Sequence, residues 1–394
     1  MKIYYKNLFA IKFHQMFIIC FIVFFSTLTS CSSSEDAISQ TTEITLQNIV
    51  DTKPNEVAWV GRSQIKSRNR TSSGYGVVLN PESKKLLIFL DGGGACFNGV
   101  TCSLNKNKFT ETDFFNSISK TNSLLINRTS DENQFKDWNL VFVPYITGDV
   151  HSGKKSSVNV PNFGPSNQEM VGSNNITIIL NDIKQYFEAN GGIEEIVFAG
   201  SSAGGFGVLA NTIQLATILG SDKPTTIIVD AGQVMNDSAI LTPCLNDMWN
   251  NLWSLNDIIS EVIDKDVYVT KSYSYDVQKI YEYLSKKYET FNFGFLSHYE
   301  DKTNRFFYSF GRDNCAYFIP IPTNPPKVTG EQFKNGLLDL KSNVFQDLNW
   351  KVFYKSGETH TFLDDAEFDQ TVQGTTLNDW IRSLREGKAE DKMD

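Results

Sequence analysis

The chain has 394 residues, which is enough for one large domain or for two or three small ones. Apolar residues make up 41% of it, and glycine and proline stay well below the levels of low-complexity chains, so the composition indicates a globular protein with a sizeable core. The net charge of −9 at pH 7 gives the surface no general attraction for nucleic acid, and we exclude nucleic acid as a partner.

The first thirty residues differ in composition from the rest of the chain. Three lysines precede the apolar run MFIICFIVFF, which is too short for a membrane-spanning helix, and we expect residues 1–30 to be a removable export signal. The segment LTSC, which ends at Cys31, resembles the lipobox of bacterial lipoproteins, in which the cysteine becomes the acylated first residue. An ordinary signal peptide or an uncleaved anchor is the alternative. Removal of the signal takes away three lysines and changes the net charge from −9 to −12.

The segment that follows, SSSEDAISQ, is polar and acidic, and we predict that residues 31–50 form a flexible tether. Residues 51–394 are then expected to form a single domain. These features together predict an exported lipoprotein of the bacterial cell envelope that touches the membrane only through its lipid.

Cysteine usage agrees with export. Cys20 lies in the signal and Cys31 is the predicted lipid site, which leaves an even number of cysteines for an oxidising compartment. Cys96 and Cys102 are close enough to close a short loop, and Cys244 with Cys315 would be the remaining pair. Because the chain has no CxxC or histidine-rich spacing, we expect no metal site and no cofactor.

From residue 84 onward, short apolar runs alternate with segments of helical period. We predict strands within residues 84–94, 138–149, 194–200, 225–232, 291–298 and 349–357. We predict helices at residues 175–192, from the glycine cluster after Ser202 to Leu219, and at residues 274–288, 331–343 and 375–386. Such an alternation predicts one α/β domain with a mostly parallel sheet covered on both faces. Residues 149–172 read as a loop, and residues 237–273 as a helical insertion or cap.

The segment GSSAGG contains the pattern G-x-S-x-G at Gly200, Ser202 and Gly204. A predicted strand precedes it and a predicted helix follows it, which is the context of a nucleophile elbow. In this register Ser202 is the nucleophile and Ser201 is its neighbour. The turn lacks the G-x-G-x-x-G of a dinucleotide site and the lysine of a P-loop. A purely structural glycine turn is the alternative.

A serine nucleophile needs a base and an acid that orients the base. Beyond the signal the histidines are His151, His298 and His360, and His360 follows the last predicted strand of the sheet, where the base of an α/β-hydrolase belongs. Asp301 follows the preceding strand and is the predicted acid. Asp230, at the end of the strand after the nucleophile helix, is the second candidate for the acid.

The tetrahedral intermediate of ester hydrolysis also needs hydrogen-bond donors for its oxyanion. The segment LDGGGACF places three glycines at the end of an early strand, where backbone N–H groups are free to point at a ligand. We predict that Gly93 and Gly94 donate from this loop, and that Ala203 donates from the position after the nucleophile.

Several of these motifs, in this order, resemble the family of pectin acetylesterases and Notum carboxylesterases. The likeness rests on LIFLDGGGACFNGVTC, WNLVFVPYITGDVHSG, GSSAGGFGVL, VDAG and a late histidine. It implies an α/β-hydrolase-like fold and a serine esterase, with the same nucleophile, acid, base and oxyanion donors as above. Where many relatives carry a bulky aromatic residue, this chain has Gly94 with Ala95, and His151. The resemblance therefore implies that His151 lines the acyl pocket and contacts substrate.

The expected activity is hydrolysis of a carboxylic ester, foremost an acetyl ester of a pectin-like polysaccharide. Two alternatives stay open at this point. One is a glycan-binding surface lipoprotein without catalytic activity, and the other is a deacylase of the Notum kind that acts on a protein or lipid ester.

Overall fold

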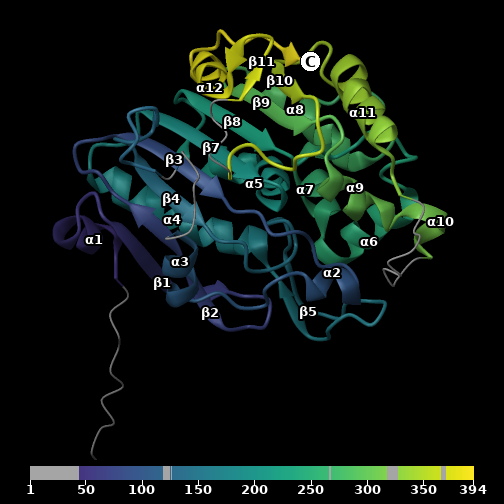
Figure 1. Cartoon of the computed structure of the whole chain (residues 1–394). Coiled ribbons are helices and arrows are strands. Elements are labelled where there is room, and N and C mark those ends of the chain that lie inside the picture. Colours follow the sequence, from purple (N-terminus) through teal and green to yellow (C-terminus); the bar gives the residue numbers. More distant parts are fainter. Residues whose placement is uncertain (1–43, 119–124, 126, 266–267, 317–326, 365–369) are drawn as a thin grey trace, which may run out of the picture. The chain divides into compact units, whose positions relative to one another are not determined.

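The computed structural model describes residues 44–118, 125, 127–265, 268–316, 327–364 and 370–394, and a nine-stranded sheet runs through them (Figure 1). The order of its strands is β1-β2-β4-β3-β7-β8-β9-β10-β13. β1 and β2 pair antiparallel, β2 pairs antiparallel with β4, and all pairs from β4 to β13 are parallel. The bounds are β1 (Val57–Lys66), β2 (Ser72–Val78), β3 (Lys85–Leu90), β4 (Asn139–Val143), β7 (Glu195–Ser201), β8 (Thr225–Asp230), β9 (Asn292–His298), β10 (Trp350–Lys355) and β13 (Lys392–Met393).

Helices cover both faces of the sheet, which explains why the central strands are continuous apolar runs. On one face Gly76 of β2 meets Phe114 of a helix, and Gly294 of β9 meets Trp380 of another; a Cβ atom at Gly76 would lie 2.1 Å from the Phe114 ring. The strand register places Gly76 and Gly294 on the same face. The helices of this face are α3 (Glu111–Ile118) and α12 (Leu377–Arg385).

The opposite face carries the helix that follows the nucleophile turn. Trp350 of β10 pairs with Phe293, next to Gly294, so its side chain points to this second face, where its indole N–H donates to the Tyr281 carbonyl of α8. α5 packs against β7, β8, α4 and α8. The bounds are α4 (Gly172–Ala189), α5 (Ala203–Leu219) and α8 (Lys279–Lys287).

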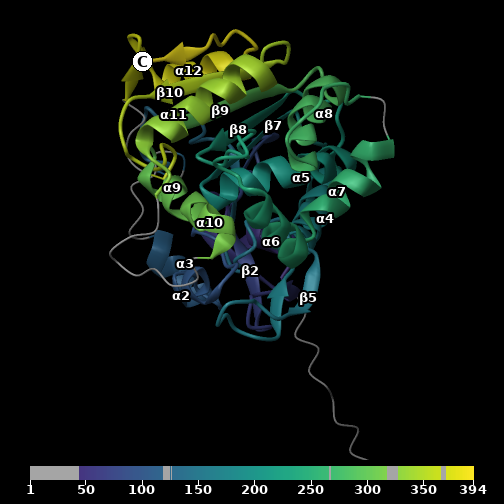
Figure 2. The same cartoon turned by 90° about the vertical axis from the view of Figure 1, so that its right-hand side faces the viewer.

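A further group of helices lies at the side of the molecule that is on the right in Figure 1 and faces the viewer in Figure 2. α6 (Pro243–Trp253) and α7 (Leu255–Glu261) come from the segment predicted as a helical insertion. Three residues separate β9 from α9 (Lys302–Ser309), and α10 (Arg312–Cys315) and α11 (Gly330–Asp339) follow α9. The disulfide Cys244–Cys315 joins the first turn of α6 to the end of α10.

The predicted boundary between tether and domain is wrong, because the domain begins before residue 50. Residues Leu46–Thr52 form helix α1, which Thr45 caps by accepting the Asn48 N–H, and its buried Leu46 and Ile49 bring it against α4. The predicted signal, Cys31 and most of the predicted tether lie outside the described residues. No helix of the described part is long and apolar enough to cross a membrane.

Small elements complete the fold. The predicted loop at residues 149–172 contains a short antiparallel hairpin, β5 (Lys155–Val158) with β6 (Gln168–Met170). β11 (Thr371–Val372) pairs with β12 (Thr375–Thr376) ahead of α12. The five-residue α2 (Gly99–Ser103) follows the triple-glycine loop, and the disulfide Cys96–Cys102 closes the loop that leads into it.

Candidate active site

Ser202 occupies a sharp turn between β7 and α5. Its backbone has φ 55° and ψ −120°, a region that side-chain-bearing residues adopt only under strain. The neighbouring glycines make the turn possible, because a Cβ atom at Gly204 would lie 1.9 Å from the Leu90 carbonyl oxygen, and one at Gly200 would lie 2.4 Å from the Gly204 carbonyl oxygen. The backbone N–H of Ser202 donates to the carbonyl of Asp230 at 2.7 Å. The motif therefore forms the nucleophile elbow that its sequence predicts.

His360 and Asp301 meet Ser202 in one line of hydrogen bonds. His360 Nε2 lies 2.7 Å from Ser202 Oγ, and His360 Nδ1 lies 2.8 Å from Asp301 Oδ2. Asp301 is completely buried, whereas the His360 side chain keeps 21% of its surface exposed. The structure thus brings together three residues that lie up to 158 positions apart in the chain.

The Asp301 carboxylate is held from several sides. It caps α9, where Oδ1 accepts the N–H groups of Thr303 and Asn304, each at 2.9 Å. The Asn304 side chain donates to Oδ2 at 2.8 Å and to the Ala231 carbonyl at 2.9 Å. These bonds fix the orientation of the oxygen that faces His360. Asn304 is not among the site residues predicted from the sequence, although its position three residues after Asp301, in the first turn of a helix, is a pattern that could have indicated it.

The triple-glycine loop packs directly against the nucleophile turn. A Cβ atom at Gly92 would lie 2.9 Å from the Ser201 carbonyl oxygen, and one at Gly93 would lie 2.5 Å from the Tyr145 ring. Gly94 has φ +82°, which glycine adopts without strain. Within the described residues the N–H groups of Gly93 and Gly94 donate to no protein acceptor. Ala203 begins α5, so its N–H has no acceptor within the helix.

Arg68 is hydrogen-bonded to the loop that the disulfide Cys96–Cys102 closes. Its buried guanidinium donates to the carbonyls of Cys102 and Asn105, at 3.1 and 3.0 Å, and to Cys96 Sγ. Burial lowers the pKa of Arg68 from its usual value. Cys96 N–H in turn donates to the Gly148 carbonyl at 2.7 Å. The chain segment that follows the glycines is therefore fixed at both of its cysteines.

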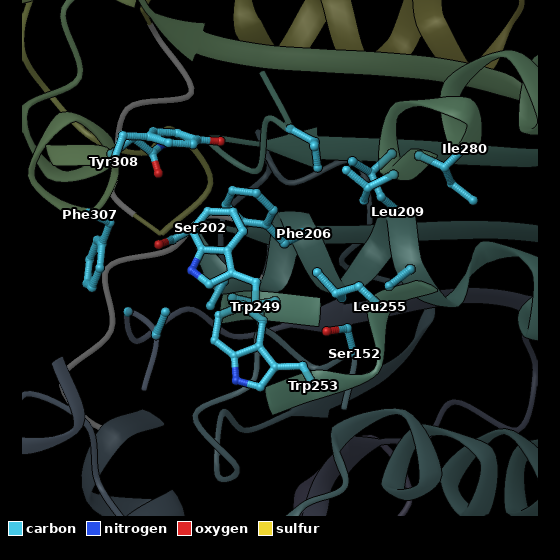
Figure 3. A pocket seen from close by; sticks show the side chains of 18 of the residues that line it. Ser152, Ser202, Phe206, Leu209, Trp249, Trp253, Leu255, Ile280, Phe307 and Tyr308 are labelled. Carbon is cyan, nitrogen blue, oxygen red and sulfur yellow. The ribbon is translucent and has the colours of Figure 1, made fainter. Parts of the chain in front are cut away.

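An apolar pocket opens beside Ser202 (Figure 3). Its walls come from α5, α6, α7, α8 and α9, and they are formed mainly by aliphatic and aromatic side chains. Among them Trp249 and Trp253 of α6 stack on one another with ring centroids 5.6 Å apart. The lining residues include Gly94, Ala95, Val150, Ser152, Ser202, Phe206, Leu209, Ala210, Trp249, Trp253, Leu255, Ile259, Ile280, Asn304, Phe307 and Tyr308. We call this space the acyl pocket.

A second, more open cavity also meets Ser202. We call it the open cavity; its lining includes Ser202, His360, Thr303, Asp91 and Asp364. Removal of the Asp91 carboxyl from solvent raises its pKa to about 8, and the charge of Asp364 adds to the shift. The two spaces share Ser202, Gly94 and Phe307, so a substrate bound across Ser202 would place one part in each.

His151 does not line the acyl pocket, and its predicted contact with substrate is wrong. Its ring is buried, with Nε2 2.9 Å from the Asp91 carbonyl oxygen and the ring centroid 4.9 Å from that of Tyr145. Burial lowers its pKa to about 4. Its neighbours Val150 and Ser152 take the lining positions instead. The backbone of residue 151 has φ +57°, which turns the side chain inward in a way that the sequence does not reveal.

The remaining candidates have other places. Asp230, the second candidate for the acid, is not hydrogen-bonded to His360, whose two ring nitrogens meet Asp301 and Ser202; its carboxylate accepts the N–H groups of Phe362 and Leu363. His298 is buried and stacks on Phe362 with centroids 4.1 Å apart, and burial lowers its pKa to about 4. Ser201 points to Asp230, with its Oγ 3.3 Å from the carboxylate, and not to a cavity. Among the described residues no cluster of three or more histidine, cysteine, aspartate or glutamate side chains could hold a metal ion.

This fold, with a serine at the strand–turn–helix corner of a mostly parallel sheet, defines the class of α/β-hydrolase-like proteins. The sequence profile described as pectinacetylesterase matches residues 73–382, and the chain belongs to that family.

Similar proteins agree with this assignment. The palmitoleoyl-protein carboxylesterase NOTUM of Schmidtea mediterranea is 34% identical over 139 residues, which cover 34% of this chain and 24% of that protein. The palmitoleoyl-protein carboxylesterase notum2 of Xenopus laevis is 27% identical over 210 residues, 51% of this chain and 42% of that protein. The chain thus matches less than half the length of these relatives.

A similar fold is found in a solved structure of the Wnt deacylase Notum from Drosophila. The two structures superpose with a TM-score of 0.59 over 87% of this chain and 96% of the other, at 16% sequence identity. At this level of identity the likeness concerns the fold alone. It agrees with the α/β-hydrolase-like architecture expected from the order of strands and helices.

Proposed function

We propose that the chain hydrolyses carboxylic esters with Ser202 as nucleophile, His360 as general base and acid, and Asp301 as the carboxylate that orients the histidine. The observation that carries this proposal is the line of hydrogen bonds from Ser202 Oγ to His360 and from His360 to Asp301, at 2.7 and 2.8 Å. An Asp301 carboxylate on Nδ1–H leaves Nε2 without a proton, so Nε2 accepts the serine proton.

The reaction would proceed in two halves. Ser202 Oγ attacks the ester carbonyl carbon while its proton passes to His360 Nε2, and the carbonyl oxygen becomes an oxyanion that accepts the N–H groups of Gly93, Gly94 and Ala203. The intermediate collapses, the alcohol leaves with the proton from His360, and an acyl-serine remains. Water then attacks the acyl carbon and gives its proton to His360, and collapse releases the carboxylic acid and returns the proton to Ser202.

We further propose that the acyl group is longer than acetyl. The acyl pocket extends from Ser202 to Leu209 and Ala210, seven and eight residues along α5, or roughly 10 Å at the helical rise per residue. Among its polar side chains, Ser152 donates to the Asp149 carbonyl at 2.7 Å, whereas the buried indole N–H groups of Trp249 and Trp253 have no hydrogen-bond partner among the described residues. An acetyl group would fill only the entrance of such a pocket, whereas each buried methylene of a longer chain adds roughly 0.8 kcal/mol of binding.

Acetyl esters of a pectin-like polysaccharide are the second candidate substrate. The family description supports this candidate, as does the polar lining of the open cavity, where Asp91, Thr303 and Asp364 would face the alcohol part of an ester. Both candidates use the same serine, and only the length of the acyl group and the nature of the alcohol separate them. A glycan-binding protein without activity has no need for a serine held at hydrogen-bonding distance from a histidine.

Turnover of p-nitrophenyl esters by the soluble domain tests the proposed reaction. Wild-type protein should hydrolyse these esters, and Ser202→Ala and His360→Ala should each lower kcat by about 10⁴-fold. Unchanged turnover in either variant would contradict the proposal. Comparison of acetate, butyrate and octanoate esters then separates the two substrate candidates.

We also propose that the protein is exported and anchored through a lipid on Cys31. The two disulfides of the described domain support an oxidising compartment. Metabolic labelling with an alkyne fatty acid should mark the wild-type protein and not Cys31→Ser. Equal labelling of both proteins would exclude Cys31 as the lipid site.

A further inference from the structure

Asp230 is hydrogen-bonded both to the loop that carries His360 and to the turn that carries Ser202. It ends β8, the strand next to β7, which leads into the turn of Ser202, and its side chain is completely buried. One carboxylate oxygen, Oδ2, accepts the N–H groups of Phe362 and Leu363, both at 2.8 Å. Phe362 and Leu363 follow His360 by two and three residues. Asp230 therefore binds the loop that carries His360, the histidine loop, just after the histidine.

The same residue also holds the nucleophile turn. Its backbone carbonyl accepts the Ser202 N–H at 2.7 Å, and its Oδ2 lies 3.3 Å from Ser201 Oγ. The backbone carbonyl of Asp230 thus binds the nucleophile turn, and its carboxylate binds the histidine loop. A shift of one loop relative to the other would have to break hydrogen bonds at Asp230.

The histidine loop has separate anchors before the histidine. The Glu300 N–H donates to the Gly357 carbonyl at 2.9 Å, and the Lys302 N–H donates to the Glu358 carbonyl at 3.2 Å. These bonds fix the loop to the segment that carries Asp301. Past His360, the backbone N–H groups of Phe362 and Leu363 both donate to Asp230. The position of the imidazole therefore depends on Asp230 on one side and on the Asp301 segment on the other.

The Asp230 carboxyl is buried in a way that is unfavourable for the stability of the fold. Its other oxygen, Oδ1, has no hydrogen-bond partner among the described residues, and burial raises the pKa of Asp230 well above its usual range. A buried polar atom without a partner is unfavourable, and an apolar side chain would avoid it. What an apolar side chain lacks is the acceptor for the two N–H groups of the histidine loop.

We infer that Asp230 is a positioning residue for the reaction, which sets the separation of His360 Nε2 and Ser202 Oγ by joining the histidine loop to the nucleophile turn. This inference rests on the proposed function of Ser202 and His360. Asp230 does not line either cavity that meets Ser202, so it acts through these residues and not on the substrate. A misplacement of about 1 Å between reacting groups can lower a rate about 10²-fold, which is the order of effect at stake.

Two substitutions separate the acceptor from the rest of the side chain. Asp230→Leu keeps the branched shape of the side chain and removes the acceptor, and we expect kcat for a p-nitrophenyl ester to fall about 30- to 100-fold with KM changed less than twofold. Asp230→Asn keeps one oxygen for the two N–H groups and should retain kcat within about threefold. The rate of labelling by a fluorophosphonate should fall in Asp230→Leu by the same factor as kcat, since both reactions need the activated serine.

Two controls accompany these variants. Asp182→Leu removes a partly buried carboxylate that accepts bonds from Arg62 and Tyr75, at 2.8 and 2.7 Å, and should lower stability without changing kcat. Asp301→Asn should lower kcat by about 10⁴-fold, as loss of the orienting carboxylate does.

The outcomes decide the inference in each case. A folded Asp230→Leu protein with kcat within twofold of wild type would overturn it. If Asp230→Leu does not fold, Asp230→Asn tests the inference instead. A loss of kcat in Asp230→Asn as large as that in Asp301→Asn would overturn it, because the reaction would then depend on the charge of Asp230 and not on its role as acceptor. Full activity of Ser202→Ala would overturn the proposed function itself, whereas an inactive Ser202→Ala beside a fully active Asp230→Leu would overturn only the role of Asp230.

Discussion

Asp301 and Asn304 share one turn of α9, and together they aim a single carboxylate oxygen at the histidine. The Asn304 amide donates at 2.8 Å to the same Oδ2 atom that lies 2.8 Å from His360 Nδ1. Oδ1 is occupied by two backbone N–H groups. Because every hydrogen bond of the carboxylate comes from a fixed donor, the imidazole is held in one orientation without the need for a contact to substrate.

The close approach of the nucleophile turn to β3 predicts a large effect of one methyl group. In Gly204→Ala the new Cβ would lie 1.9 Å from the Leu90 carbonyl oxygen, and we expect the free energy of unfolding to fall by about 3 kcal/mol or the variant not to fold. Urea denaturation of the wild type and the variant measures this change.

Gly61→Ala is the matched control, since the nearest atom to its new Cβ is 3.7 Å away, in the Trp59 side chain. It should change the free energy of unfolding by about 0.5 kcal/mol or less. Equal stability of Gly204→Ala and Gly61→Ala would mean that the turn is looser than the structure has it.

The acyl pocket predicts a dependence on chain length. If methylenes enter the pocket, kcat/KM should rise by up to about fourfold for each one between acetate and octanoate, the equivalent of roughly 0.8 kcal/mol each. Ala210→Phe places a ring at the far end of the pocket and should reduce kcat/KM for octanoate about tenfold or more, while the acetate ester is unaffected. Steady-state kinetics with the two esters on wild type and variant make this test, and a preference for acetate in the wild type would favour the acetylesterase candidate.

The buried His151 predicts a loss of stability in acid. Its pKa is about 4 in the folded protein because burial disfavours the charged ring, compared with about 6.5 when unfolded. A lowered folded pKa means that the stability it contributes is present above about pH 6.5 and is lost as the pH falls towards 4, by about 3 kcal/mol in all. The difference between wild type and His151→Phe in the free energy of unfolding at pH 7 and pH 4.5 isolates this contribution.

Other groups titrate in the same range, notably Asp149, whose pKa burial raises to about 6, and His298, whose pKa burial lowers to about 4. They are present in both proteins of the comparison, so their effects largely cancel. An equal pH dependence in wild type and His151→Phe would refute the neutral state of His151.

Part of this architecture can be read from the sequence. Ser202 follows from the spacing of Gly200 and Gly204 after an apolar strand, since steric limits at the turn leave few other residues possible there. His360 and Asp301 follow from the order of the strands, because the carboxyl ends of parallel strands lie at one edge of the sheet. The triple glycine marks the loop that packs on the nucleophile turn for a similar steric reason.

Other parts of the structure depend on backbone angles and on contacts between distant segments, which the pattern of residues along the chain does not show. His151 turns inward on a backbone with φ +57°. Its ring then packs against Tyr145, six residues earlier, and Gly207, 56 residues later in the chain. The role of Asp230 depends on a loop 132 residues later. The tether is predicted from the polar, acidic segment SSSEDAISQ, and the two buried side chains of α1, Leu46 and Ile49, are too few to give a clear helical period against it.

The most direct test of the central claim is the site of covalent labelling by a fluorophosphonate, mapped by peptide mass spectrometry. The structure distinguishes two adjacent serines, since Ser202 Oγ lies 2.7 Å from His360 Nε2, whereas Ser201 Oγ faces the buried Asp230 carboxylate. We predict one adduct per chain, on Ser202, with labelling lost in His360→Ala and kept in Ser201→Ala. An adduct on Ser201, or no labelling of the folded wild-type domain, would contradict the account.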